Sequence, residues 1–318
     1  MASYKARSGQ TFDVLRHRRL PILGAMLLLG LVYAAVPQLG ILDTSWSVLL
    51  QSDRSTIALA VGFLLVSFAA AASIYHLLTP KKIRYGQTYL VQVAGAFAGK
   101  VLPVGLGSIS VNYLYLRKRG CNQAAAATVV AVNNLLGFVG HGIWLLILAL
   151  FFSTQIHVFT KQRPSTWLIL GLAAGALVVA AVLLLLRKRF QVLLKGVSKQ
   201  LRGYRAKPGR LFVALAASML LTACNIAIVW LSASALHVPL TVVAAAVALT
   251  AGVLAQSATP TPGGLGGVEA GLVAGLALSG MKLEHAIMIT IMFRLITFWL
   301  PLGLGSIALL AAMRQKLL

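Results

Sequence analysis

The 318 residues are 59% hydrophobic and only 10% charged, with a mean hydropathy of +0.89, which excludes an ordinary soluble domain and predicts an integral membrane protein. The formal net charge of +23 would favour nucleic acid as the partner of a soluble protein, but here the basic residues gather in short segments between apolar runs. This arrangement follows the positive-inside rule, so anionic lipid headgroups are the expected counter-charge and no nucleic acid is expected.

The first half of the chain is predicted to contain three membrane crossings and one interrupted segment. Basic residues in 1–19 precede an apolar run at about 20–42, which we interpret as a retained first helix rather than a cleaved signal peptide. Runs at about 56–78 and 123–152 are predicted as the second and third crossings. Between them, the run at about 88–116 has basic residues on both flanks, and a single crossing cannot place both flanks in the cytoplasm.

The run at about 88–116 is interrupted by the sequence Pro103-Val104-Gly105-Leu106-Gly107. Proline removes a backbone donor and clashes with a continuing helix, whereas glycine permits a positive φ. The interruption and the flanking charges together predict two half-helices that enter from the cytoplasm and return to it, which is a re-entrant hairpin.

The second half begins with a crossing at about 167–186 and a segment at 187–210 that holds nine basic residues and no acidic one. Apolar residues recur at helical spacing in this segment, which predicts an amphipathic helix on the anionic lipids of the inner leaflet. A solvated topology signal is the alternative, and the sequence leaves it open. Crossings at about 211–236 and 286–313 follow, and the last of them ends at the basic tail 314–318.

The run at about 240–279 contains the sequence T-P-T-P-G-G-L-G-G-V-E at residues 259–269, where prolines and glycines break the helix. The final crossing must begin outside if it ends in the cytoplasm, so residues 240–279 are predicted to enter from outside and return there. Glu269 restarts the helix and is the only one of five acidic residues at the expected depth of the bilayer. A carboxylate persists there only when it is buried in protein or lines a wet cavity.

The two interruptions share the pattern P-x-G-L-G, at residues 103–107 and 262–266, and their offset is 262 − 103 = 159, half of 318. The predicted fold is therefore an all-α polytopic membrane protein. It is built from two inverted-topology repeats, 20–152 and 153–313, each with three spans and one re-entrant hairpin. Transporters with this plan place their discontinuous helices near the middle of the membrane.

The half-helices offer unpaired N–H groups and the positive end of a helix dipole, which favour phosphate or carboxylate. Lys100 precedes the first break and could add a cation, and Arg294 lies within reach of the midplane. We therefore predict the following substrate-binding residues: Lys100, Pro103, Gly105, Gly107, Asn133, Pro262, Gly263, Gly264, Gly266, Glu269 and Arg294.

Two of these predictions carry alternatives that the residues leave open. Asn133, Gly137 and His141 recur every four residues, so they form either a polar wall of a cavity or a face of interhelical hydrogen bonds. Glu269 and Arg294 either open to admit a headgroup or form a fixed ion pair that neutralises two buried charges.

Four stretches of this chain resemble the lysylphosphatidylglycerol synthase transmembrane-region family, whose members are flippase-like membrane proteins. They are P-T-P-G-G-L-G-G-V-E-A, L-P-V-G-L-G-S, Y-L-R-K-R-G and F-R-L-I-T-F-W-L-P, and the resemblance covers about residues 20–313. It implies a transporter-like domain that moves polar-headed lipids between leaflets, with Glu269 and Arg294 at signature positions, together with Pro262, Gly263, Gly264 and Gly266. Many relatives carry an acidic residue and an arginine just after the first break, where this chain has Ser108 and Val111.

The predicted function is a flippase that moves a phospholipid or other lipid with a polar or charged headgroup across the cell membrane by alternating access, with both termini cytoplasmic. A small-anion channel or exchanger stays open, because it also uses opposed half-helix N-termini. A non-transporting assembly partner of a lipid or envelope enzyme stays open as well. Enzymatic activity, a metal and a cofactor are not expected, because one intramembrane carboxylate, scattered histidines and two distant cysteines form no acid–base pair or ligand cluster. The sequence does not predict the oligomeric state.

Overall fold

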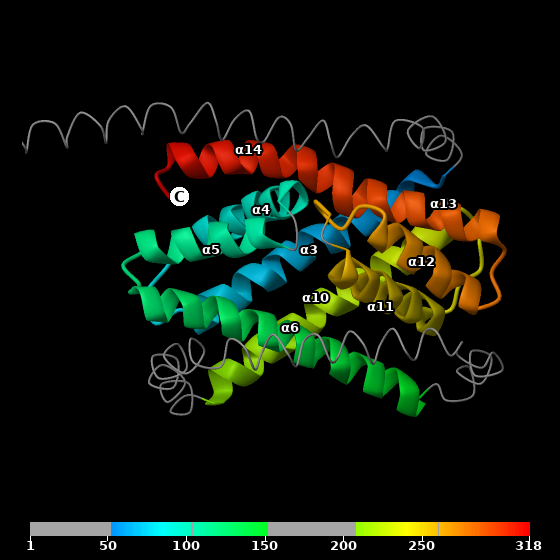
Figure 1. Cartoon of the computed structure of the whole chain (residues 1–318), viewed down its shortest axis with the longest axis horizontal. Helices are drawn as coiled ribbons and strands as arrows, with labels where there is room; N and C mark the ends of the chain where they lie inside the picture. The colour runs from blue at the N-terminus through cyan, green and yellow to red at the C-terminus, as the bar shows by residue number, and fades with distance from the viewer. Residues whose placement is uncertain (1–51, 103–104, 152–207, 260) are drawn as a thin grey trace, which may run out of the picture.

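The computed structural model describes residues 52–102, 105–151, 208–259 and 261–318. The predicted runs at 20–42 and 167–186, the basic N-terminal segment and most of the basic loop lie outside the described residues. Within them the chain forms the following helices, drawn in Figure 1: α3 (Arg54–Leu78), α4 (Tyr85–Val101), α5 (Leu106–Lys118), α6 (Gln123–Phe151), α10 (Pro208–Ala235), α11 (Val242–Ala258), α12 (Gly267–Leu278), α13 (Leu283–Arg294), the π-helix η2 (Leu295–Trp299) and α14 (Leu300–Arg314).

Four stretches of the described chain are long and apolar enough to cross a membrane: Arg54–Leu78, Gln123–Ile147, Pro208–Ala235 and Leu283–Arg314. A crossing needs about 20 residues to span a hydrocarbon core of about 30 Å. The helices α4, α5, α11 and α12 contain 17, 13, 17 and 12 residues, so each is about 18–26 Å long and too short to cross alone. The predicted all-helical fold with several membrane helices is confirmed.

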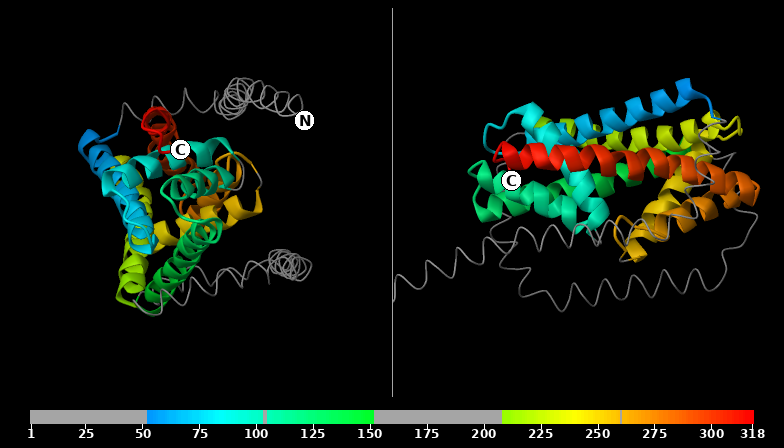
Figure 2. Two further views of the ribbon diagram at one scale, coloured as in Figure 1. Left: turned by 90° about the vertical axis from the view of Figure 1, so that its left-hand side faces the viewer. Right: turned by 90° about the horizontal axis from the view of Figure 1, so that it is seen from above.

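The helices α3 and α10 form an antiparallel pair that packs along its length and lies on one side of the molecule (Figure 2). The N–H of Asp53, just before α3, donates to the carbonyl of Ala235 at the end of α10, at 3.0 Å. Buried side chains of both helices, among them Ala60, Leu64 and Ile228, belong to one core cluster. Two of the long crossings are therefore joined by continuous apolar packing, and they run in opposite directions as the charge pattern predicts.

The helices α4 and α5 form an antiparallel hairpin. Gln92 Nε2 donates to Asn112 Oδ1 at 2.8 Å, and the hydroxyls of Thr88 and Tyr115 lie 3.0 Å apart. Higher numbers on one helix therefore pair with lower numbers on the other. Nearest the turn, the Cα of Gly107 lies directly against the carbonyl of Ala98, a close approach that only a residue without a Cβ permits.

The helices α11 and α12 form a second antiparallel hairpin of the same kind. Gly275 lies against Ala248, and Gly271 lies against Ala251, so the two backbones approach closely along the pair. Small residues at such contacts are typical of helices packed within membranes, where close backbone approach supplies van der Waals contact. The sequence therefore uses the same device, glycine on one helix facing alanine on the other, in both hairpins.

The two hairpins open toward opposite ends of the molecule (Figures 1 and 2). The first opens toward an end that we call the basic end, which carries Lys81, Lys82, Arg84, Arg117, Lys118, Arg119, Arg210, Arg314 and Lys316. The second opens toward the end where α3 begins and where α13 follows α12. Their tips meet: a Cβ built on Gly263 would lie 3.1 Å from the carbonyl oxygen of Lys100. The two chain interruptions are thus neighbours in space.

Changing Gly107 to alanine is expected to lower the free energy of unfolding by about 1–3 kcal/mol. The added methyl group would overlap the backbone carbonyl of Ala98, which cannot move aside as a flexible side chain can. Gly62 is a suitable control, because a Cβ there has no atom within 4 Å, and its alanine variant should be neutral or stabilised by about 0.5–1 kcal/mol. Thermal unfolding of both variants in detergent measures the difference. Equal stability of the two would show that the hairpin does not depend on this contact.

The start of α3 is capped by Asp53, whose carboxylate accepts hydrogen bonds from the hydroxyls of Thr56 at 2.5 Å and Ser55 at 2.8 Å and from their backbone N–H groups. These bonds, led by the Thr56 hydroxyl, lower the pKa of Asp53 from 3.8 to about 2. A lowered carboxylate pKa stabilises the fold above the unfolded value, and this stabilisation is lost as the pH falls through about 2.

We therefore expect the amide protons of Ser55 and Thr56 to become less protected from hydrogen exchange as the pH is lowered from about 4 to about 2. In Asp53→Asn this step should vanish while the cap is retained, because asparagine is an equally good cap without a titrating group. The test compares both proteins by hydrogen exchange with mass spectrometry. A step of the same size in Asp53→Asn would assign the pH dependence to another group.

Candidate functional site

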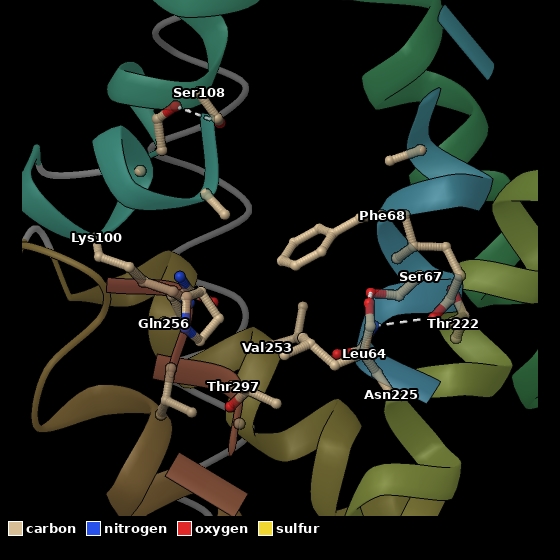
Figure 3. Close-up of a pocket in the computed structure, with 18 of the residues that line it drawn as sticks. Leu64, Ser67, Phe68, Lys100, Ser108, Thr222, Asn225, Val253, Gln256 and Thr297 are labelled. Carbon is tan, nitrogen blue, oxygen red and sulfur yellow. Dashed lines mark hydrogen bonds between the residues drawn. The ribbon is translucent and has the colours of Figure 1, made fainter. Parts of the chain in front are cut away.

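A cavity of about 460 Å³ lies between the hairpin tips and the pair α3 and α10. Figure 3 shows Lys100, Ser108 and Gln256 on one side of it and Ser67, Thr222 and Asn225 on the other. Residues of every described helix from α3 to α14 contribute to its walls, with Leu64, Phe68 and Val253 among the apolar ones. The polar or charged residues of the lining are Ser67, Gln92, Lys100, Ser108, Asn112, His141, Thr222, Asn225, Gln256, Arg294 and Thr297.

An ion pair holds the second hairpin to the last crossing. Arg294 Nε donates to Glu269 Oε1 at 2.7 Å, and the same guanidinium reaches the carbonyl of Gly263 at 3.4 Å. Glu269 lies in the first turn of α12, where the positive end of the helix dipole favours a carboxylate. The side chain of Arg294 is 6% exposed and that of Glu269 is 21% exposed. Arg294 is thus buried and Glu269 is half-buried, and the break in the helix places the carboxylate where the two groups can meet.

Lys100 is the second cation of the site, and it lies in the last turn of α4, where the negative end of the helix dipole favours a positive charge. Its Nζ atom is 5.7 Å from the centre of the Phe298 ring, and the guanidinium carbon of Arg294 is 4.5 Å from the same ring. Among the described residues, the side chain of Lys100 makes no hydrogen bond or ion pair. Two cations and one carboxylate therefore sum to a formal charge of +1 beside the cavity.

A chain of hydrogen bonds fixes the start of α5 against α4. Gln92 donates to Asn112, Asn112 Nδ2 donates to the carbonyl of Ser108 at 2.9 Å, and Ser108 Oγ donates to the carbonyl of Gly105 at 3.0 Å. These side chains line the cavity and at the same time satisfy one another, so they shape its wall. The prediction from sequence missed Gln92 and Asn112, although the Ser108–Asn112 spacing of four residues places both on one helix face.

His141 also lines the cavity, and its Nε2 atom lies 3.0 Å from the hydroxyl of Thr250 on α11. This bond joins α6 to the second hairpin. Asn133, on the same row of α6, is half-buried and is not part of the cavity wall. Both interpretations of this row therefore hold for His141. It makes a hydrogen bond between helices, and it also lies on the wall of the cavity.

The structure separates the remaining predicted site residues into two groups. Gly105 lines the cavity, as Lys100 and Arg294 do, and its φ of +68° requires glycine. Glu269, Pro262 and Gly266 do not line the cavity. Glu269 is paired with Arg294, Pro262 is half-buried and Gly266 is exposed. Pro103 lies outside the described residues. Gly107 belongs to this second group because it is packed against Ala98.

Gly263 and Gly264 serve the packing of the second turn. Both have a positive φ, and a Cβ on Gly263 would lie 2.5 Å from the Phe298 ring, while one on Gly264 would lie 2.5 Å from Gln256. The absence of a Cβ at both glycines thus allows the backbone of the turn to pack closely against Phe298 and Gln256. Of these two glycines, Gly263 contacts a charged side chain of the site, since its carbonyl accepts a hydrogen bond from Arg294.

Between Arg294 and Pro301 the last crossing widens into the π-helix η2, in which the N–H of Leu300 donates to the carbonyl of Leu295, five residues back. Thr297, on the cavity wall, and Phe298, the ring under the two cations, both belong to this short stretch. Single π turns in long helices occur often at functional sites. Among the described residues, no three His, Cys, Asp or Glu side chains gather closely enough to hold a metal ion.

The family model for the lysylphosphatidylglycerol synthase TM region matches residues 22–305. The chain belongs to this family. The resemblance predicted from the two interruptions and the late arginine is therefore confirmed, and it extends over nearly the whole chain. Comparison with curated protein sequences finds no match. For this member of the lysylphosphatidylglycerol synthase TM region family, the match supports a membrane protein related to lipid metabolism or lipid transport.

Proposed function

We propose that this protein moves an anionic phospholipid between the two leaflets of the cell membrane. The observation that carries the proposal is the cavity of about 460 Å³ at the meeting point of the two hairpin tips, whose wall combines apolar and polar side chains and includes Lys100 and Arg294. Its neighbouring carboxylate, Glu269, balances only one of the two cations. A phosphate oxygen supplies the missing negative charge, and a cavity of this kind inside a membrane protein holds a headgroup away from hydrocarbon.

The hairpins in this proposal are re-entrant and belong to two inverted repeats. In one repeat α3, the hairpin α4–α5 and α6 follow one another, and in the other α10, the hairpin α11–α12 and the crossing from α13 to α14 do so. The short helices and the opposite directions of the hairpins support this reading, since inverted repeats place broken helices at the midplane. The basic end is then cytoplasmic, because positive charge is retained on that side.

The anion is proposed to bind at the first tip rather than at the second. The first turn of α5 contains no acidic residue, and Gly105 and Ser108 line the cavity there, close to Lys100. The first turn of α12 contains Glu269, which already occupies the positive end of that helix. The headgroup would therefore lie between Lys100, Arg294 and the N-terminus of α5, while the acyl chains stay in the bilayer and the two repeats move to alternate the access.

A small-anion channel or exchanger is the second candidate, because a net positive cavity between helix ends also favours a free anion. One experiment separates the two. The purified protein is reconstituted into vesicles, and the loss of fluorescent phosphatidylglycerol from the outer leaflet is measured together with electrical conductance. We expect lipid movement without conductance. Conductance without lipid movement would establish the ion pathway, and the absence of both would favour an assembly partner without transport.

A further inference from the structure

Alongside the cavity, a second hollow of about 390 Å³ lies between α5 and α6, and we call it the α5–α6 groove. Ser110 and Tyr113 line it from α5, and Ala131 and Asn134 line it from α6. Ser110 and Asn134 are exposed, and Tyr113 is half-buried. Within the described part of the chain, none of these three polar side chains makes a side-chain hydrogen bond. The groove therefore presents unsatisfied polar groups on the outside of the helix pair.

The depth of these groups makes them costly in hydrocarbon. Asn134 lies 134 − 123 = 11 residues after the start of α6 at the basic end, which places it about 17 Å along the helix, near the middle of a hydrocarbon core of about 30 Å. An amide without a partner at that depth is unfavourable and marks a polar pathway or a buried contact. A ligand with polar groups that lies in the groove would satisfy it.

The groove and the cavity lie on one continuous face of α6. Asn134 in the groove and His141 in the cavity are seven residues apart, which is two helical turns. Gly137 lies between them, and a Cβ placed there would have no atom within 4 Å. On α5, the cavity residue Ser108 is followed directly by groove residues. Gly137 therefore leaves open space on α6 between the groove and the cavity, where the groove can lead into the cavity.

We propose that the α5–α6 groove is the path by which the headgroup of a phospholipid from the leaflet at the basic end reaches the cavity, with its acyl chains remaining in the bilayer. This inference rests on the proposed function and adds the route. Arg117 and Lys118 lie in the last turn of α5, at the basic end, where their charge would attract an anionic headgroup. Tyr113, Ser110 and Asn134 then offer hydrogen bonds along the groove, and the headgroup passes Gly137 to Lys100.

The route predicts that a leucine at Gly137 slows transport. The side chain would fill the open space and have to be displaced for each headgroup, which we expect to reduce the rate about tenfold. Gly142 provides the matched control: it lies on the same helix, a Cβ there also meets no atom within 4 Å, and it lies five residues farther from the basic end, beyond the proposed passage at Gly137. Gly142→Leu should keep the wild-type rate, and both variants should unfold at the wild-type temperature. Equal rates for the two variants would overturn the route.

A binding measurement keeps this inference separate from the proposed function. A benzophenone amino acid is placed at position 134 and, in a second protein, at position 142, in vesicles with equal amounts of phosphatidylglycerol and phosphatidylcholine. Lipid adducts formed on illumination are identified by mass spectrometry. We expect adducts at position 134 to be enriched in phosphatidylglycerol about fivefold over those at position 142. Equal compositions would overturn the groove as a headgroup path even if the protein transports lipid. Enrichment in a protein that moves no lipid would retain the groove and reject the transport function.

Discussion

Replacing Arg294 with glutamine is expected to lower the free energy of unfolding by about 3–5 kcal/mol. The cause is the carboxylate that remains. Glu269 Oε1 accepts a bond of 2.7 Å from Arg294, and Glu269 Oε2 is buried without a hydrogen-bond partner among the described residues. Without the guanidinium, the carboxylate keeps its desolvation cost and loses its only ion pair within the described chain. Thermal and denaturant unfolding of the purified protein in detergent measure this loss.

The control is the double variant Glu269→Gln with Arg294→Gln. It removes both charges and should recover most of the lost stability, because two facing amides carry no uncompensated charge. A double variant as unstable as Arg294→Gln would instead assign the loss to the bond with Gly263 or to the contact with Phe298.

The same double variant separates the two readings of the ion pair. If the pair only neutralises two buried charges, the stable double variant should transport lipid at close to the wild-type rate. If the cation binds the headgroup, transport should be lost although the fold is recovered. Measuring stability and transport on one preparation makes the comparison direct.

Replacing Lys100 with glutamine is expected to slow the transport of phosphatidylglycerol about tenfold or more while leaving the thermal stability nearly unchanged. Lys100 has no ion pair within the described chain, so its removal leaves no opposite charge unpaired, in contrast to Arg294. Its proposed contact with a phosphate is lost, and hydrogen bonds to charged groups are among the stronger ones. Fluorescent-lipid transport in vesicles gives the rate, and Lys100→Arg should retain a substantial part of it.

The control for this prediction is Lys282→Gln. Lys282 is exposed at the opposite end of the molecule, so its loss should alter neither transport nor stability. Transport of phosphatidylcholine, which carries a neutral headgroup, should be reduced less by Lys100→Gln than transport of phosphatidylglycerol. Wild-type rates of phosphatidylglycerol transport in Lys100→Gln would contradict the position that we propose for the anion.

The interruptions of the helices could be predicted from sequence because their causes are local. Pro262 and its glycines cannot continue a helix, and neither can the Pro103 segment, so α11 ends and α12 begins within a few residues of the predicted positions. The ion pair was predictable for a different reason. Few charged residues lie within the apolar stretches, so Glu269 and Arg294 were the expected partners of each other. The structure shows them as an ion pair.

The wall of the cavity could not be predicted in the same way, because it depends on contacts between helices that are far apart in sequence. Gln92 meets Asn112 only when the hairpin has closed, and Phe298 lies under both cations only when the last crossing packs against the two tips. Helical spacing likewise identifies the row of Asn133 and His141, but it does not show that only His141 reaches the cavity. Sequence also cannot tell a glycine that faces a ligand from one, such as Gly107, that faces a backbone.

The π-helix at Leu295–Trp299 holds about one residue more than an α-helical turn needs. Absorbing that surplus into α geometry would rotate the helix on one side of it by about 100° relative to the other side, the turn contributed by a single residue. Arg294 lies immediately before this stretch and Phe298 lies inside it. The rotation would therefore move the guanidinium away from the aromatic ring while the helix stays continuous. The last crossing thus carries one extra residue next to Arg294. A shift from π to α geometry there would rotate one part of the helix against the other without unfolding it.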